Sequence, residues 1–136
     1  MMIPTATQPS PRHRVDLNCW VLAKAIMPVG DGSEQHHFFR AMVRDVSATG
    51  VGLLITQIDR MRLFTGPERP LLRLLLPLTG DTLEIDLEPV DVGIFDPSVH
   101  LMAIGTRIRS FGSGSEEKFL NFINNFQCEQ LSQPRD

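Results

Sequence analysis

Apolar and polar residues alternate in two stretches of this chain, residues 15–26 and 83–88, and a period of two is typical of strands that bury one face. Between residues 15 and 26 the apolar members share one face: Val15, Leu17, Cys19, Val21, Ala23 and Ala25. Runs with similar strand character follow at His37–Asp45, Val51–Thr56, Leu71–Leu76, Thr82–Ile94 and His100–Ile108. A short helix is expected at Ile58–Phe64, and turn residues separate the runs. These six strands predict a mainly β domain.

The period changes after Arg109 from two to about 3.6 residues, which is the period of an α-helix. Apolar side chains recur on one helix face at Phe119, Phe122, Ile123 and Phe126. We therefore expect an amphipathic helix from about Ser115 to Gln130. Its apolar face is expected to cover one end or one face of the sheet.

The two ends of the chain differ in composition from its middle. Residues 1–11 hold Pro4, Pro9 and Pro11 among Ser, Thr and Gln, and such a segment buries too little apolar surface to order itself. We interpret it as a flexible arm and residues 132–136 as a frayed tail. With 136 residues in all, of which 42% are hydrophobic, the segment 12–131 is expected to form one domain with one core.

Charge and hydropathy exclude several classes of partner. Lys and Arg number 13 against 16 Asp and Glu, a net charge of −3, so the chain lacks the positive field that holds a nucleic acid polymer. No apolar run approaches the roughly 20 residues that span a bilayer, so we expect no membrane insertion. The N-terminus has no secretory signal pattern, which predicts a cytoplasmic protein. Cys19 and Cys128 are expected to be reduced.

Sequence patterns of enzymes and metal sites are missing. The chain has no GxSxG, HExxH, GxxxxGK or GxGxxG pattern. His36 and His37 are adjacent on a predicted strand and therefore point to opposite faces, which disfavours a shared metal. The carboxylates Asp81, Glu84, Asp86 and Glu88 mark the solvated face of a strand. We expect neither catalysis, nor a bound metal, nor a resident cofactor.

Two segments can bind an anion or a nucleotide. Arg12 and Arg14 lie where the arm meets the first strand, and guanidinium groups bind phosphate oxygens in pairs and stack on purines. In the connection Asp45-Val46-Ser47-Ala48-Thr49-Gly50, a carboxylate and a hydroxyl offer polar contacts and the glycine allows positive φ and close backbone approach. The alternative is an ordinary Ser or Asx turn beside solvated flank charges.

The order of these features resembles the PilZ domain family. The connection fits the family pattern [D/N]xSxxG in full, with Asp45, Ser47 and Gly50 at the defined positions. Arginines precede the first strand, and the run Ala103-Ile104-Gly105-Thr106-Arg107-Ile108 is similar to the family's last strand before its closing helix. The resemblance covers about Arg12 to Leu131. It implies a six-stranded antiparallel β-barrel with a C-terminal α-helix.

The resemblance also implies that the ligand is cyclic di-GMP. In the family an RxxxR motif contacts phosphates and guanine faces, and the Asp, Ser and Gly of the turn receive a guanine edge. This chain departs from RxxxR, since with Arg14 as the second arginine the first position holds Ser10, and Arg12 lies between them. Val92 falls near a position where family members often carry an aromatic residue.

Two functions remain open at this point. In the first, the chain is a bacterial second-messenger receptor that binds cyclic di-GMP through Arg12, Arg14, Asp45, Ser47 and Gly50. It then passes the signal to an unidentified protein effector that controls motility, biofilm formation or exopolysaccharide. In the second, it is a PilZ-like adaptor that binds no nucleotide and acts by protein contacts in pilus, flagellar or secretion machinery. The apolar residues that favour the adaptor are Met61, Leu63 and Phe64.

Overall fold

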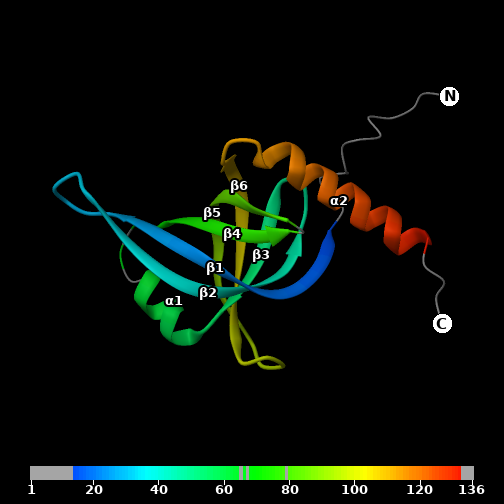
Figure 1. The fold of residues 1–136 in the computed structure, drawn as a ribbon. Coiled ribbons are helices and arrows are strands. Elements are labelled where there is room, and N and C mark those ends of the chain that lie inside the picture. The colour runs from blue at the N-terminus through cyan, green and yellow to red at the C-terminus, as the bar shows by residue number, and fades with distance from the viewer. Residues whose placement is uncertain (1–13, 65, 67, 79, 133–136) are drawn as a thin grey trace.

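Six antiparallel strands close into a barrel in the order β1-β2-β3-β6-β5-β4, and a helix follows the last strand (Figure 1). The computed structural model describes residues 14–64, 66, 68–78 and 80–132. The strands are β1 (Val15–Pro28), β2 (Glu34–Val46), β3 (Gly50–Ile55), β4 (Leu71–Leu78), β5 (Asp81–Asp96) and β6 (Leu101–Phe111), and the helices are α1 (Gln57–Leu63) and α2 (Ser115–Ser132). The predicted fold class is confirmed. Arg12 and the predicted arm at residues 1–11 lie outside the described residues.

The alternation in β1 separates buried from exposed side chains as the sequence predicts. Val15, Val21, Ala23 and Ala25 are buried in the core, whereas Trp20 on the opposite face is 44% exposed. The β1–β2 hairpin pairs from Pro28↔Glu34 to Val15↔Val46, so both strands extend further towards the hairpin tip than predicted. Burial raises the pKa of the Cys19 thiol, which makes it less reactive.

The barrel closes where β4 pairs with β1, between Leu22↔Leu75 and Ile26↔Leu71. The strand predicted at Leu71–Leu76 is two residues too short, because β4 continues through Pro77 to Leu78. Pro77 lies beyond the last pairing with β1 and pairs with Thr82 of β5, so it is placed where one edge of β4 has no partner strand. A proline is tolerated at such an edge because its nitrogen donates no hydrogen bond.

A partly buried ion pair joins β4 to β5. Arg73 donates from Nε and Nη2 to the two carboxylate oxygens of Asp86, at 2.8 and 3.2 Å. These charge-assisted bonds hold the pKa of Asp86 below its ordinary value and raise the pKa of Arg73. The pair therefore fixes the register of two strands near the seam that closes the barrel.

The apolar face of α2 covers one end of the barrel (Figure 1). Phe119 and Ile123 are fully buried, and the Phe119 ring packs against Phe111 of β6 with 5.5 Å between the ring centroids. The hydroxyl of Ser115 accepts a hydrogen bond from the backbone N–H of Glu84, which ties the start of the helix to β5. The predicted orientation of α2 is confirmed for these residues, while the side chain of Phe126 lies outside the described set.

The helix α1 contributes one side chain to the core and exposes others. Thr56 caps it by accepting a hydrogen bond from the N–H of Asp59. Leu63 is buried, so the expectation that it forms part of an exposed apolar surface is wrong, and Phe64 packs partly against the core. Ile58 and Met61 are exposed, at 69% and 64%.

The core position of Phe119 predicts the effect of removing its ring. Phe119→Ala should lower the free energy of unfolding by about 3–5 kcal/mol, because truncation of a buried aromatic loses transfer free energy and leaves a cavity. The matched control is Phe38→Ala, since Phe38 is 64% exposed and should change stability by less than about 1 kcal/mol. Urea unfolding followed by circular dichroism measures both. Equal effects of the two substitutions would contradict the packing of α2.

Candidate ligand-binding site

The connection between β2 and β3 is a tight turn held by Ser47. Its hydroxyl accepts from the N–H groups of Thr49 and Gly50, at 3.3 and 3.1 Å, and its own N–H donates to the carbonyl of Gly50 at 2.8 Å. Ser47 is buried. The structure therefore gives this hydroxyl the role of an ordinary Ser turn.

Gly50 is required by close backbone approach. A Cβ at this position would lie 2.6 Å from the carbonyl oxygen of Thr106 on β6. The expected positive φ at Gly50 is wrong, since the glycines with positive φ in the described residues are Gly32, Gly80, Gly93 and Gly114. Its small size lets β3 pair with β6 at the edge of the turn, where Gly50 faces Arg107.

The two segments singled out in the sequence meet at Asp45. Nη1 of Arg14 lies 2.9 Å from Oδ1 of Asp45, and Nε of Arg44 lies 3.3 Å from Oδ2. Asp45 is 7% exposed, whereas the side chain of Arg14 is 63% exposed. The carboxylate is thus enclosed between two cations that reach solvent, and the sequence-distant residues 14 and 45 lie at one place on the barrel surface.

A row of four residues crosses the outer surface of the barrel beside this ion pair. The row follows from the strand register: Asp45 of β2 pairs with Gly52 of β3, Gly52 with Gly105 of β6, and Gly105 with Asp91 of β5. A Cβ on Gly52 would lie 2.7 Å from Oδ1 of Asp45, and one on Gly105 would lie 3.5 Å from Cβ of Asp91. The side chains of both aspartates therefore lie on the outer face of the barrel, next to the two glycines, which have no side chain there.

Three residues of this glycine row, Gly52, Gly105 and Asp91, line a cavity of about 570 Å³, which we call the glycine trough. Three cations line it, Arg14, Arg44 and Arg107, and Arg107 also pairs with Glu88 at 3.0 Å. The remaining lining residues are Ser47, Thr49, Gly50, Val51, Gly52, Val90, Asp91, Ile94, Ala103, Gly105 and Thr106. The trough combines a flat peptide floor with guanidinium groups and apolar side chains, which suits a flat, anionic ligand.

The apolar wall of the glycine trough differs from the one suggested by the sequence. Val92 packs against the core and lines a separate small cavity with Arg60 and Phe64. Val90 and Ile94, its neighbours on β5, line the trough and are 50% and 67% exposed. Irregular pairing of β5 with β6 between Pro89 and Ile94 accounts for this placement.

Of the trough residues, the candidate site residues included only Arg14, Ser47 and Gly50. Among those that sequence reasoning missed are Arg44, Gly52, Asp91, Gly105 and Arg107. Isolated glycines inside predicted strands, at 52 and 105, indicate a close approach of backbone or ligand and were the available signal. No local sequence pattern marked Asp91 or Arg107 as site residues. Both reach the trough because of the register in which β6 pairs with β3 and β5.

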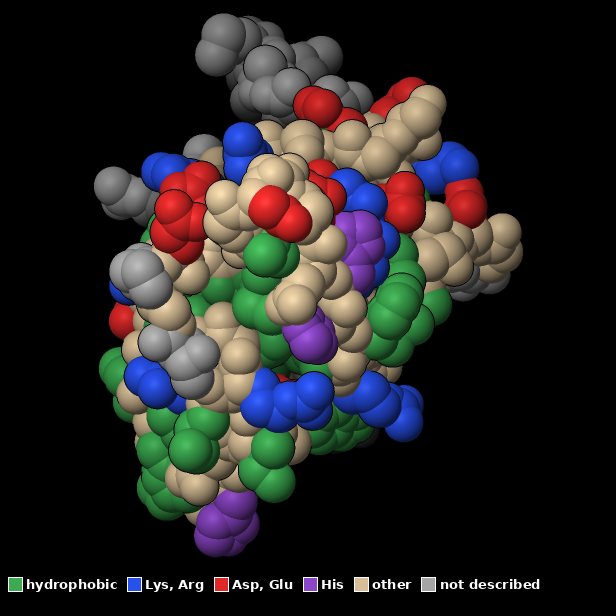
Figure 2. Space-filling view, turned by 90° about the vertical axis from the view of Figure 1, so that its left-hand side faces the viewer, with side chains coloured by type: hydrophobic (Ala, Val, Ile, Leu, Met, Phe, Trp, Pro, Cys, Tyr) green, Lys and Arg blue, Asp and Glu red, His purple; other side chains and the backbone are tan. Residues whose placement is uncertain are grey.

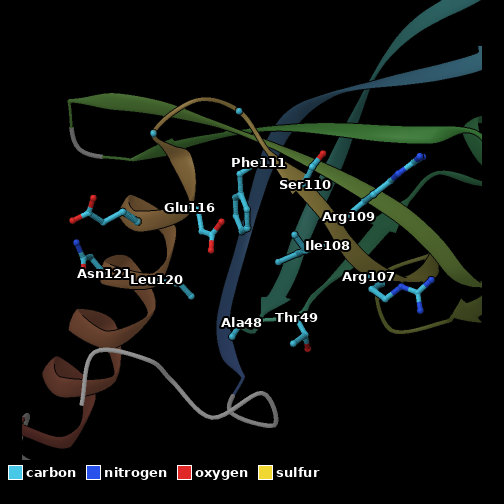
Figure 3. A pocket seen from close by; sticks show the side chains of 13 residues that line it. Ala48, Thr49, Arg107, Ile108, Arg109, Ser110, Phe111, Glu116, Leu120 and Asn121 are labelled. Carbon is cyan, nitrogen blue, oxygen red and sulfur yellow. The ribbon is translucent and has the colours of Figure 1, made fainter. Parts of the chain in front are cut away.

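A second cavity adjoins the glycine trough. It measures about 1100 Å³ and lies between β6 and α2, and Thr49 and Arg107 line both cavities (Figure 3). Phe111 and Leu120 lie at its sides, while Arg107 and Arg109 extend away from α2 (Figure 3). Its lining residues carry charges of both signs: the cations are Arg107 and Arg109, and the carboxylates are Glu116 and Glu117.

Two further findings apply to the described part of the chain. It contains no group of three or more His, Cys, Asp or Glu side chains arranged to hold a metal ion. None of its helices has the length and apolar character needed to cross a bilayer.

The closed six-stranded barrel with a helix over one end is a PilZ-like fold. Three solved structures share it. The PilZ domain of YcgR from Escherichia coli, solved with c-di-GMP, is 14% identical, with a TM-score of 0.51 over 87% of this chain and 91% of that one. The Bacillus subtilis inhibitor of motility MotI/DgrA is 18% identical, with a TM-score of 0.55 over 90% of this chain and 51% of its own.

The third structure is MrkH of K. pneumonia in its apo state, 14% identical, with a TM-score of 0.58 over 90% of this chain and 53% of its own. This chain thus spans about half the length of MotI/DgrA and MrkH. No protein-family model and no curated protein matches the sequence. The resemblance to PilZ domains is confirmed at the level of the fold.

The close approach at Gly50 predicts a specific loss of stability. Gly50→Ala should lower the free energy of unfolding by about 1–3 kcal/mol, because its Cβ meets a backbone oxygen that cannot rotate away. Gly30→Ala is the matched control, since no atom lies within 4 Å of a Cβ there. Denaturation midpoints of the two variants measure the difference, and an unchanged midpoint for Gly50→Ala would rule out the tight β3–β6 contact.

Proposed function

We propose that this chain is a cytoplasmic receptor for cyclic di-GMP and that the ligand occupies the glycine trough. One observation carries the proposal: Arg14 and Asp45, from two motifs 31 residues apart, lie 2.9 Å from each other at the edge of a cavity with a glycine floor. The fold shared with a PilZ domain solved with c-di-GMP supports it.

The arginines would bind the phosphates of the ligand. Arg14 and Arg44 are exposed beyond their contacts with Asp45, and Arg107 reaches the trough from β6. Guanidinium groups bind phosphate oxygens through paired, charge-assisted hydrogen bonds and also stack on purine faces. Arg12, two residues before Arg14, would add a further cation, and Ser47 and Gly50 would shape the edge of the trough through the turn.

Binding would change the interactions of Arg14. Its guanidinium donates one hydrogen bond to Asp45 and is 63% exposed, so its remaining N–H groups are available to a phosphate. The segment before Arg14 would then be drawn towards the ligand, which alters the surface that a protein effector meets. An effector in motility, biofilm or exopolysaccharide control is the partner we propose, and the chain acts as a receptor rather than an enzyme.

Calorimetry with cyclic di-GMP tests this function. The unaltered chain should bind, and Arg14→Ala should weaken binding tenfold to hundredfold, since a charge-assisted phosphate contact contributes about 1.5–3 kcal/mol. Asp45→Ala should weaken it comparably by releasing both arginines. Arg62→Ala, which removes an exposed cation of α1, is the control and should have no effect. Absence of heat at high micromolar ligand would contradict the proposal.

The adaptor that binds no nucleotide is the second candidate. It is favoured by the pairing of Asp45 with Arg14 and Arg44, which gives the carboxylate its partners within the chain, and by the exposed Ile58 and Met61 of α1. Figure 2 views the side that carries α1 and the β1–β2 hairpin and shows hydrophobic side chains among the charged ones at the surface.

A pull-down from lysate with and without cyclic di-GMP separates the two candidates. A receptor should recover its effector differently in the two conditions. An adaptor should recover the same protein in both, and Ile58→Ser with Met61→Ser should then abolish recovery.

A further inference from the structure

The two aspartates of the glycine row differ in how they are engaged. Both carboxylate oxygens of Asp45 already accept hydrogen bonds, one from Arg14 and one from Arg44, and the residue is buried. Asp91 lines the trough at its opposite edge and is exposed, and its side chain makes no ion pair or hydrogen bond with any described residue. Of the two carboxylates, only that of Asp91 lines the trough, and both of its oxygens are free to accept hydrogen bonds.

We propose that Asp91 reads the guanine edge of the ligand in this chain and that Asp45 instead positions the arginines. The inference rests on the proposed function and deepens it, because it assigns base specificity to a residue outside the turn motif. Under this assignment the phosphates lie near Arg14 and Arg44, and a base reaches across Gly52 and Gly105 towards β5.

Hydrogen-bond chemistry supports this division of roles. A guanine presents two adjacent donors, N1–H and the N2 amine, and a carboxylate with two unengaged oxygens can accept both. Asp45, by contrast, is 7% exposed and is not among the residues that line the trough, and its oxygens already accept hydrogen bonds from Arg14 and Arg44. A base that lies in the trough therefore meets the carboxylate of Asp91 rather than that of Asp45.

The shape of the trough agrees with a base lying beside Asp91. Gly105 has no side chain, so its backbone is uncovered next to Asp91. A Cβ built on Gly105 would lie 3.5 Å from Cβ of Asp91. Val90 and Ile94 flank Asp91 on β5, and both side chains are exposed and line the cavity. A flat ring on the peptide floor would thus contact apolar side chains while its donor edge meets the carboxylate.

Asp91→Asn in the full chain tests the inference, with two probes. One is cyclic di-GMP, and the other is its inosine analogue, which keeps N1–H and lacks the N2 amine. The asparagine retains one acceptor and turns an N–H group towards the second donor. We expect at least a tenfold loss of affinity for cyclic di-GMP and a much smaller loss for the inosine analogue, so that the preference for guanine over inosine collapses.

Two comparison variants make the result specific. Glu68→Gln removes one exposed negative charge away from the trough and should leave both affinities unchanged. Asp45→Asn should weaken both probes by a similar factor, because it acts through the arginines and the phosphates common to both ligands. Since Asp91 has no partner among the described residues, Asp91→Asn should keep the unfolding midpoint of the unaltered chain, which shows that the fold is intact.

The outcomes separate this inference from the proposed function. If the unaltered chain binds cyclic di-GMP and Asp91→Asn binds both probes as tightly, or weakens both equally, Asp91 does not read the base and the inference is overturned alone. If the unaltered chain binds no cyclic di-GMP, the proposed function fails and the inference fails with it.

Discussion

The paired carboxylate of Asp45 determines how this surface of the barrel is built. Its oxygens Oδ1 and Oδ2 lie 2.7 and 3.3 Å from where a Cβ on Gly52 would be, and the residue is only 7% exposed. A buried carboxylate is stable only when it is paired. The first described residue, Arg14, and the β2 residue Arg44 supply the two cations. This requirement fixes where the chain enters the barrel and gathers positive charge at one edge of the glycine trough.

The closed barrel supplies the rest of the trough. Because β3 pairs with β6 and β6 with β5, the glycines at 52 and 105 fall side by side, and Asp91 follows in the same row. The core beneath is continuous, with Leu53 and Ile104 fully buried on the opposite face of the same strands. At the end covered by α2, Phe119 and Ile123 complete that core. The trough is therefore a surface feature supported by a continuous apolar core.

The sequence predicted the elements of this fold well because their signals are local. Six short runs with strand character and one change of period are visible within short windows, and the connection from Asp45 to Gly50 is itself a local pattern. The errors concern non-local information. Leu63 is buried because α1 packs on the barrel, and Pro77 is tolerated because β4 has passed its pairing with β1. Asp91 joins the site through a strand register that no local window contains.

The central claim is that the ligand lies on the glycine row between β2 and β5. An NMR titration of the full chain with cyclic di-GMP tests it most directly, since each backbone amide reports its own surroundings. The account predicts the largest shifts at Gly52, Gly105 and Asp91, together with Arg14. Shifts confined to the cavity between β6 and α2, at Ser110, Phe111 and Leu120, or no shifts at saturating ligand, would contradict it.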